Sequence, residues 1–167
     1  MSKQPFLESY DGQTTQQLIA MRGSYRIDSL VLAFEQAVGR KPTYRLTKPE
    51  YVVLAVEAME REVNNGGYQL FFGNSSREFT GFIVRALELI GCPKCAAITA
   101  DAIAVLELPA WYDDITIKQT VVDLPDDRHT KLGECDSRYY ANDEPIADAL
   151  FAYIEQHQHE IQIPYVG

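Results

Sequence analysis

Apolar residues recur every three or four positions along much of this chain, and that spacing restricts it to a helical fold. Residues 27 to 38 show the pattern most clearly, with apolar side chains at Ile27, Leu30, Val31, Phe34, Ala37 and Val38. These positions lie on one face of an α-helix, which Gly39 then ends. Residues 79 to 90 repeat the pattern, and Gly91 ends that second helix.

The segment from residue 47 to residue 64 predicts a helix in the middle of a bundle. Thr47 and Glu50 have the spacing of a capping box, which marks the start of a helix. The six residues after Glu50 are all apolar or aromatic, so nearly every side of this helix should face other protein. The glycine pair that follows predicts its end near Asn64.

Three further helices are predicted, at residues 14 to 21, 93 to 106 and 143 to 161. In the last of these, Asp143 is expected to cap the helix and Pro145 to occupy its first turn. Residues 111 to 130 lack a consistent period, and we expect a loop with at most a turn of helix there. The chain is therefore predicted to be all-α, a single-domain helical bundle of about six helices over residues 1–167.

The net charge of −9 is confined to the C-terminal part of the chain. Residues 1–106 contain 11 acidic and 11 basic side chains, whereas residues 107–167 contain 13 acidic and 4 basic ones. Direct binding to nucleic acid requires a basic surface, so this composition excludes it. A segregated acidic charge of this kind is typical of a surface that binds another protein.

No feature of the sequence points to a membrane or to secretion. The apolar runs are too short to cross a bilayer, and the N-terminus lacks the apolar stretch of a signal peptide. The three cysteines are an odd number, which argues against a disulfide framework. We therefore expect a cytoplasmic protein with reduced thiols.

Cys92 and Cys95 form a CxxC pair, which can bind zinc or cycle through a disulfide. A structural zinc site needs four ligands, and the chain has no second CxxC. Thiol-redox pairs of this kind follow a strand in a βαβ unit, which this helical pattern does not contain. We expect no metal and no cofactor, with a metal or thiol-redox role for the pair as an alternative.

One segment is distinctive, and it lies where the central helix should stop. Its key positions are Glu62, Asn64, Asn65, Gly66, Gly67, Tyr68, Gln69, Phe72 and Asn74. The glycines allow positive φ at the helix end, the asparagines can cap backbone groups, and the aromatic residues can pack into the core. The segment is thus interpreted as structural, with a small polar pocket at Glu62, Asn65, Gln69 and Asn74 as the alternative.

This segment resembles the signature of a bacterial family of DNA-mimic proteins, the DNA mimic protein 19-like domain of unknown function. The resemblance covers about residues 45–160 and leaves residues 1–25 as a less certain N-terminal extension. It implies an all-helical homodimer with an acidic surface. It also implies that this surface occupies the DNA-binding face of a helix-turn-helix transcription factor or another basic DNA-binding protein, as a regulator of transcription.

Carboxylates spaced along a folded surface can take the place of DNA phosphates in a basic groove. The candidate partner-binding residues are Glu107, Asp113, Asp114, Asp123, Asp126, Asp127, Glu134, Asp136, Asp143, Glu144 and Asp148. No catalytic residues are predicted, so we expect a binding protein and not an enzyme. The alternative function is a small-ligand-binding protein or an enzyme that uses a polar pocket at the Asn-Asn-Gly-Gly segment.

Overall fold

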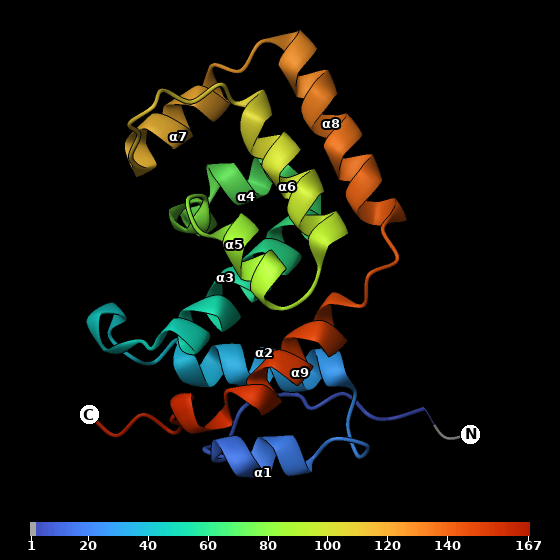
Figure 1. The fold of residues 1–167 in the computed structure, drawn as a ribbon, viewed down its shortest axis with the longest axis vertical. Helices are drawn as coiled ribbons and strands as arrows, with labels where there is room; N and C mark the ends of the chain where they lie inside the picture. The colour runs from blue at the N-terminus through green and yellow to red at the C-terminus, as the bar shows by residue number, and fades with distance from the viewer. Residues whose placement is uncertain (1–2) are drawn as a thin grey trace. The chain divides into compact units, whose positions relative to one another are not determined.

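The computed structural model describes residues 3–167, and the regular secondary structure of this part of the chain is helical (Figure 1). It contains nine α-helices and three short 3-10 helices, with no strand beyond an isolated bridge between Arg22 and Tyr25. The all-α prediction is confirmed, but the predicted number of about six helices is wrong. The additional helices have between six and sixteen residues, and most are too short or too polar to show a full apolar stripe.

The contacts within the chain form two compact units. Unit 1 comprises the residues up to Glu57 together with Pro145–Gly167, and unit 2 comprises Ala58–Glu144. Helix α3 (Lys48–Gly66) runs through the boundary and contributes residues to each unit. The sequence predicted one domain for the whole chain, and that statement stays a prediction.

Unit 1 is built around helix α2 (Ile27–Val38), whose apolar stripe is buried apart from the partly exposed Ile27. Helix α2 packs against α1 (Thr15–Ala20) and against α9 (Ile146–Gln156), as Figure 1 shows. The buried side chains include Leu18, Leu30, Phe34 and Phe151. The 3-10 helices η1 (Thr43–Arg45) and η3 (Gln158–Glu160) complete the unit.

The predicted capping box at the start of α3 is present. The backbone N–H of Thr47 donates to Glu50 at 3.0 Å, and the backbone N–H of Glu50 donates to the Thr47 hydroxyl at 3.3 Å. The Glu50 carboxylate is fully buried and also accepts from Lys41 at 2.6 Å and from the backbone of Gln162 at 3.0 Å. One carboxylate thus caps a helix, neutralises a buried lysine and binds the C-terminal segment.

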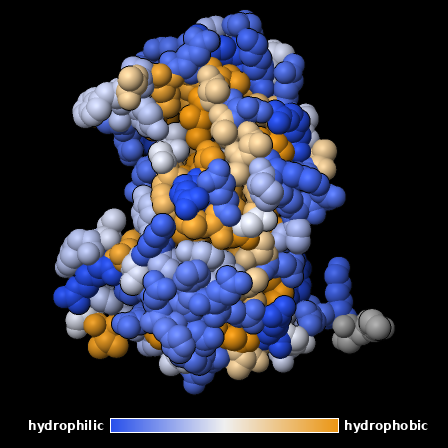
Figure 2. Space-filling view, in the orientation of Figure 1, coloured by the Kyte–Doolittle hydropathy of each residue, from blue (hydrophilic) through white to orange (hydrophobic). Residues whose placement is uncertain are grey.

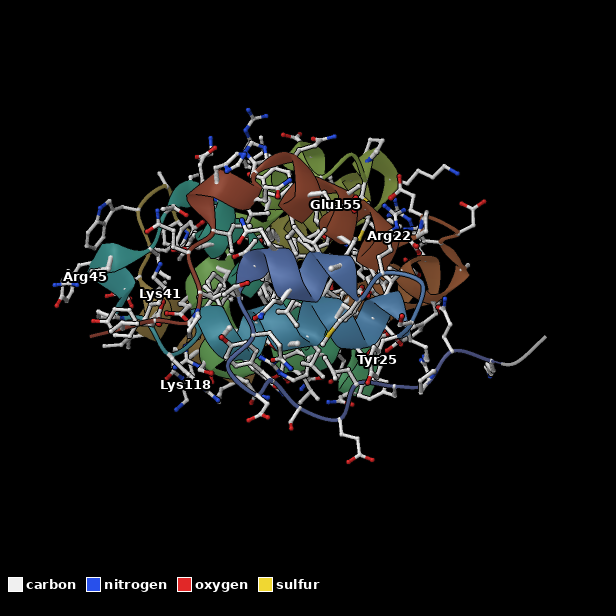
Figure 3. All side chains as sticks on the ribbon, turned by 90° about the horizontal axis from the view of Figure 1, so that it is seen from below. Arg22, Tyr25, Lys41, Arg45, Lys118 and Glu155 are labelled. Atoms are coloured by element: carbon white, nitrogen blue, oxygen red, sulfur yellow. The ribbon has the colours of Figure 1, made fainter. Side chains whose placement is uncertain are left out.

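Unit 2 contains the remaining helices, with α6 and α4 at its centre. Helix α6 (Pro93–Val105) packs against α5 (Ile83–Leu89) and α8 (Asp126–Ala141), and α4 (Tyr68–Gly73) packs against α7 (Asp114–Val122) and α8. A 3-10 helix, η2 (Ser75–Phe79), contacts both α4 and α7. In Figure 2, hydrophobic side chains on the visible face of this unit lie between hydrophilic ones.

The prediction of a loop at residues 111 to 130 is wrong. Helix α7 occupies Asp114–Val122, and α8 begins at Asp126. The physical reason is local, because the Asp113 side chain accepts from the backbone N–H of Thr116 at 2.8 Å and caps α7. Only Ile117 and Val121 of α7 are buried, and two core positions give too weak a period to identify a helix.

The start and the end of the last helix also differ from the prediction. Helix α9 begins at Ile146 with Pro145 at the N-cap position, and it ends at Gln156. Asp143 does not cap it, since its carboxylate accepts from the Lys94 ammonium at 3.0 Å. In the range 3–167, no helix is both long and apolar enough to cross a lipid bilayer.

Candidate functional site

The glycine pair of the distinctive segment forms a tight junction between α3 and α4. Gly67 has φ of 79° and ψ of −176°, a backbone conformation that is essentially restricted to glycine. The backbone N–H of Tyr68 donates to an Asp136 carboxylate oxygen at 2.8 Å. A Cβ atom on Gly67 would lie 2.3 Å from the other carboxylate oxygen of Asp136, so the absence of a side chain allows α8 to bind this junction.

The aromatic residues of the segment belong to the core of unit 2. The Tyr68 ring is fully buried, and its hydroxyl is hydrogen-bonded to the Thr99 hydroxyl at 2.8 Å. The ring packs edge-on against Tyr139 of α8 and stacks on Phe72 of α4. Burial raises the pKa of Tyr68 well above its ordinary value, so the phenol stays neutral and acts as a packing group.

The polar members of the segment do not form a single cluster. The Asn74 amide donates to a Glu62 carboxylate oxygen at 2.8 Å, whereas Asn64, Asn65 and Gln69 are exposed to solvent. Two cavities of about 380 and 440 Å³ lie in unit 1. They are lined by residues of the two terminal parts of the chain, and neither includes a residue of the segment.

Both thiols of the CxxC pair are buried, with exposed fractions of 1% for Cys92 and 0% for Cys95. Burial, together with the nearby carboxylates of Glu144 and Glu60, raises the pKa of Cys92 to about 11. Burial and Glu60 raise the pKa of Cys95 to about 12. Both groups are therefore thiols at neutral pH, and the thiolate is the form that attacks disulfides or binds metal. Across residues 3–167, no three His, Cys, Asp or Glu side chains are grouped to hold a metal ion.

The acidic residues divide unevenly between the two units. Unit 2 contains 15 acidic and 8 basic side chains, a net charge of −7, whereas unit 1 contains 9 acidic and 7 basic ones, a net charge of −2. Ten of the eleven candidate carboxylates belong to unit 2, and Asp148 lies in the first turn of α9 in unit 1. Most of the net charge thus belongs to one compact helical unit.

Three of the candidates bind backbone N–H groups. Asp136 is half-buried and caps the Gly67 junction, and burial raises its pKa while the bond from the Tyr68 backbone lowers it. Glu144 accepts from the backbone N–H groups of Lys94 at 2.8 Å and Cys95 at 2.7 Å, at the start of α6. Asp113 caps α7, and hydrogen bonds from Thr116 lower the pKa of Asp113. These carboxylates stabilise helix ends.

Two other candidates form ion pairs on the surface. Asp143 pairs with Lys94, and Glu107 pairs with Arg128. A third ion pair in the unit joins Arg138 to Asp101 at 2.7 Å. These pairs neutralise three of the basic side chains that would otherwise oppose the acidic surface.

The remaining five candidates of unit 2 form what we call the free acidic set. They are exposed and lie on α7, on α8 or in the turn between these helices: Asp114, Asp123, Asp126, Asp127 and Glu134. Within residues 3–167 none of the five is ion-paired, although Asp123 accepts from the Gln119 amide at 2.7 Å. Two lysines of these helices, Lys118 of α7 and Lys131 of α8, form no ion pair with a carboxylate within residues 3–167.

Comparison with protein families gives one match. The sequence model described as DMP19-like protein matches residues 44–157, which include α3 to α9 and the whole distinctive segment. Comparison with curated proteins and with solved structures gives no match.

Proposed function

This chain belongs to the DMP19-like protein family, as the distinctive segment indicated, and from that premise we propose that it is an acidic regulator that binds another protein. Its partner in this proposal is a basic DNA-binding protein, such as a helix-turn-helix transcription factor. The protein occupies the surface that would otherwise contact DNA, and it acts in the cytoplasm without binding nucleic acid itself.

The observation that carries the proposal is the free acidic set on α7 and α8 of unit 2. Its carboxylates are exposed and form no ion pair within residues 3–167, and they belong to a unit with a net charge of −7. Asp127 and Glu134 are seven residues apart on α8, so they lie on one face about 10 Å apart along the axis. That separation equals about three base-pair steps of duplex DNA, at about 3.4 Å per step.

The electrostatic field of exposed carboxylates affects the rate at which a basic partner associates. Unpaired surface carboxylates attract a basic partner over a distance, which raises the association rate and makes it sensitive to salt. Ion-paired carboxylates contribute little, because their field is largely cancelled by the adjacent cation. Binding should therefore depend on the free acidic set more than on Glu107 or Asp143.

Two further statements belong to this proposal. We expect no enzymatic activity, which is supported by the burial of Tyr68, Cys92 and Cys95 and by their raised pKa values. The family resemblance also implies a homodimer, which light scattering of the purified protein tests directly.

The test is capture from a lysate of the host cell, followed by competition with DNA. Immobilised protein should retain a DNA-binding protein at low salt and release it as salt rises. Duplex DNA that carries the partner's binding site should displace it. Failure of that DNA to compete with the captured protein contradicts mimicry, and capture of no DNA-binding protein at low salt contradicts the proposal as a whole.

A pair of variants with equal charge change locates the surface. The double variant Asp127→Asn, Glu134→Gln removes two charges of the free acidic set, and Glu8→Gln, Asp11→Asn removes two exposed charges of unit 1. The first variant should weaken capture and flatten its salt dependence, whereas the second should behave like the wild type. Equal effects of both variants would show that only net charge matters.

A further inference from the structure

Helix α7 has an outer face with an exposed apolar residue near each end and two exposed polar residues, Lys118 and Gln119, between them. Ile115 is 77% exposed and Val122 is 69% exposed, and the seven-residue interval between them returns to the same face of the helix. The opposite face contains Ile117 and Val121, which are buried where α7 packs against α4 and η2. Helix α7 thus buries one apolar face, and its opposite face presents Ile115 and Val122 to solvent on either side of polar residues.

The approach to α7 adds an exposed tryptophan. Trp111 lies three residues before the start of the helix and is 83% exposed. Its neighbour Tyr112 is partly buried, with its hydroxyl 3.6 Å from the position that a Cβ on Gly81 would occupy. We call Trp111, Ile115 and Val122 the apolar strip. Single exposed apolar residues are ordinary, whereas three of the seven large apolar side chains that are exposed in residues 3–167 lie within these twelve positions.

Carboxylates border the apolar strip at both ends of α7. Asp113 and Asp114 lie at the start of the helix, and Asp123 follows its last residue. Asp114 also lies near Glu78 of η2. Burial of Glu78 is the main cause of its raised pKa, and the negative charge of Asp114 raises that pKa further. Lys118 is the one basic residue within α7, and it lies on the outer face between Ile115 and Val122. The border of the strip is therefore predominantly negative.

This charge pattern decides what can cover the strip. A second copy placed face to face would bring these carboxylates against the same carboxylates of its partner, which is unfavourable. Anionic lipid and nucleic acid are repelled for the same reason. A protein helix with an apolar face bordered by Lys and Arg matches both the centre and the rim of the surface.

We propose that the apolar strip at α7 is the centre of the partner-binding surface and packs against an apolar helix face of a basic protein, whose cations meet the surrounding carboxylates. The inference rests on the proposed function and specifies the chemistry of its partner. DNA offers no apolar side chain, so this protein would hold its partner by contacts that DNA does not make. Such contacts slow dissociation and persist at high salt, whereas the carboxylates mainly affect association.

Trp111 makes the inference testable, because it is the single tryptophan of the chain. Two synthetic helical peptides of equal positive charge serve as probes. One has leucines along one face, and in the other these leucines are replaced by serines. The leucine peptide should shift the Trp111 emission to the blue, protect it from acrylamide quenching and bind at least about tenfold more tightly at 0.3 M salt.

Matched variants separate the strip from general hydrophobicity. The variant Ile115→Ser, Val122→Ser keeps the tryptophan reporter, and it should bind the leucine peptide no more tightly than the serine peptide. The control variant Tyr44→Ser, Val166→Ser removes two side chains of unit 1 that are equally exposed, at 83% and 84%, and should bind like the wild type. Circular dichroism checks that both variants keep their helix content.

Each outcome has a defined meaning. Equal binding of both peptides with an unmoved Trp111 emission overturns the inference and leaves the acidic proposal intact. Binding of neither peptide at low salt overturns the inference and counts against the acidic surface as well. A change of Ile115→Ser, Val122→Ser from dimer to monomer in light scattering also overturns it, since a second copy would then cover the strip.

Discussion

Replacement of Gly67 by alanine should destabilise unit 2 severely, for two separate reasons. The backbone conformation at this position, with φ of 79° and ψ of −176°, costs a residue with a Cβ about 1–3 kcal/mol. The new Cβ would also lie 2.3 Å from the Asp136 carboxylate, which must then move away. That movement breaks the bond from the Tyr68 backbone, and a hydrogen bond to a charged group contributes about 1.5–3 kcal/mol.

The expected loss of unfolding free energy is the sum of the two, about 2.5–6 kcal/mol, a large fraction of the total for a domain of this size. Urea unfolding followed by circular dichroism measures it. Gly91→Ala is the matched control, because Gly91 has a similar φ of 83° but open space where a Cβ would lie. The control should lose only about 1–2 kcal/mol from backbone strain.

A double-mutant cycle separates the two causes. In Asp136→Ala the hydrogen bond is already absent, so adding Gly67→Ala should cost only the backbone strain. The reasoning is refuted if the two substitutions are additive, or if Gly67→Ala and Gly91→Ala cost the same within about 0.5 kcal/mol.

Three other predictions concern buried ionisable groups. Burial raises the pKa of Glu60 from its ordinary 4.5 to about 7. The folded protein therefore binds the carboxyl proton of Glu60 more tightly than the unfolded chain does, and its stability falls as pH rises from 4.5 to about 7. The unfolding free energy of Glu60→Gln, measured by urea unfolding, should therefore rise by up to about 3 kcal/mol relative to that of the wild type between pH 4.5 and pH 8. A difference between the two proteins that does not change with pH would contradict this prediction. Glu50→Ala leaves the buried Lys41 unpaired and should cost about 3–5 kcal/mol in the same assay, so a loss below 1 kcal/mol would refute the importance of this pair. Cys92 and Cys95, with pKa values raised to about 11 and about 12, should react with a thiol reagent at pH 8 at least about 100-fold more slowly in the folded protein than in urea, and comparable rates would show that the thiols are accessible.

Several local features were predictable because neighbouring residues determine them. The capping box of Thr47 and Glu50 depends on residues three positions apart, and it forms as the sequence predicts. Gly67 and Gly91 end helices because of their own backbone freedom, and both have positive φ. The helical stripe at residues 27–38 likewise needs only the period of the helix.

The helices that were missed show where local rules fail. Helix α8 is polar along most of its length, and only Leu132, Cys135 and Tyr139 are buried. Its place is determined by packing against α6 and α4, which are more than twenty residues away in sequence. A helix with so few core positions is stabilised by tertiary contacts, and those do not appear as a period in the sequence.

The sequence by itself determined the all-helical class, the family segment and the asymmetric charge, because these depend on composition and on residues close together in the chain. Only the tertiary structure divided the carboxylates into bound and free ones. Asp136 meets the Tyr68 backbone across 68 residues, and Glu144 meets Lys94 across 50. A carboxylate is free or bound according to the donors that the fold brings to it, and no sequence interval specifies those donors.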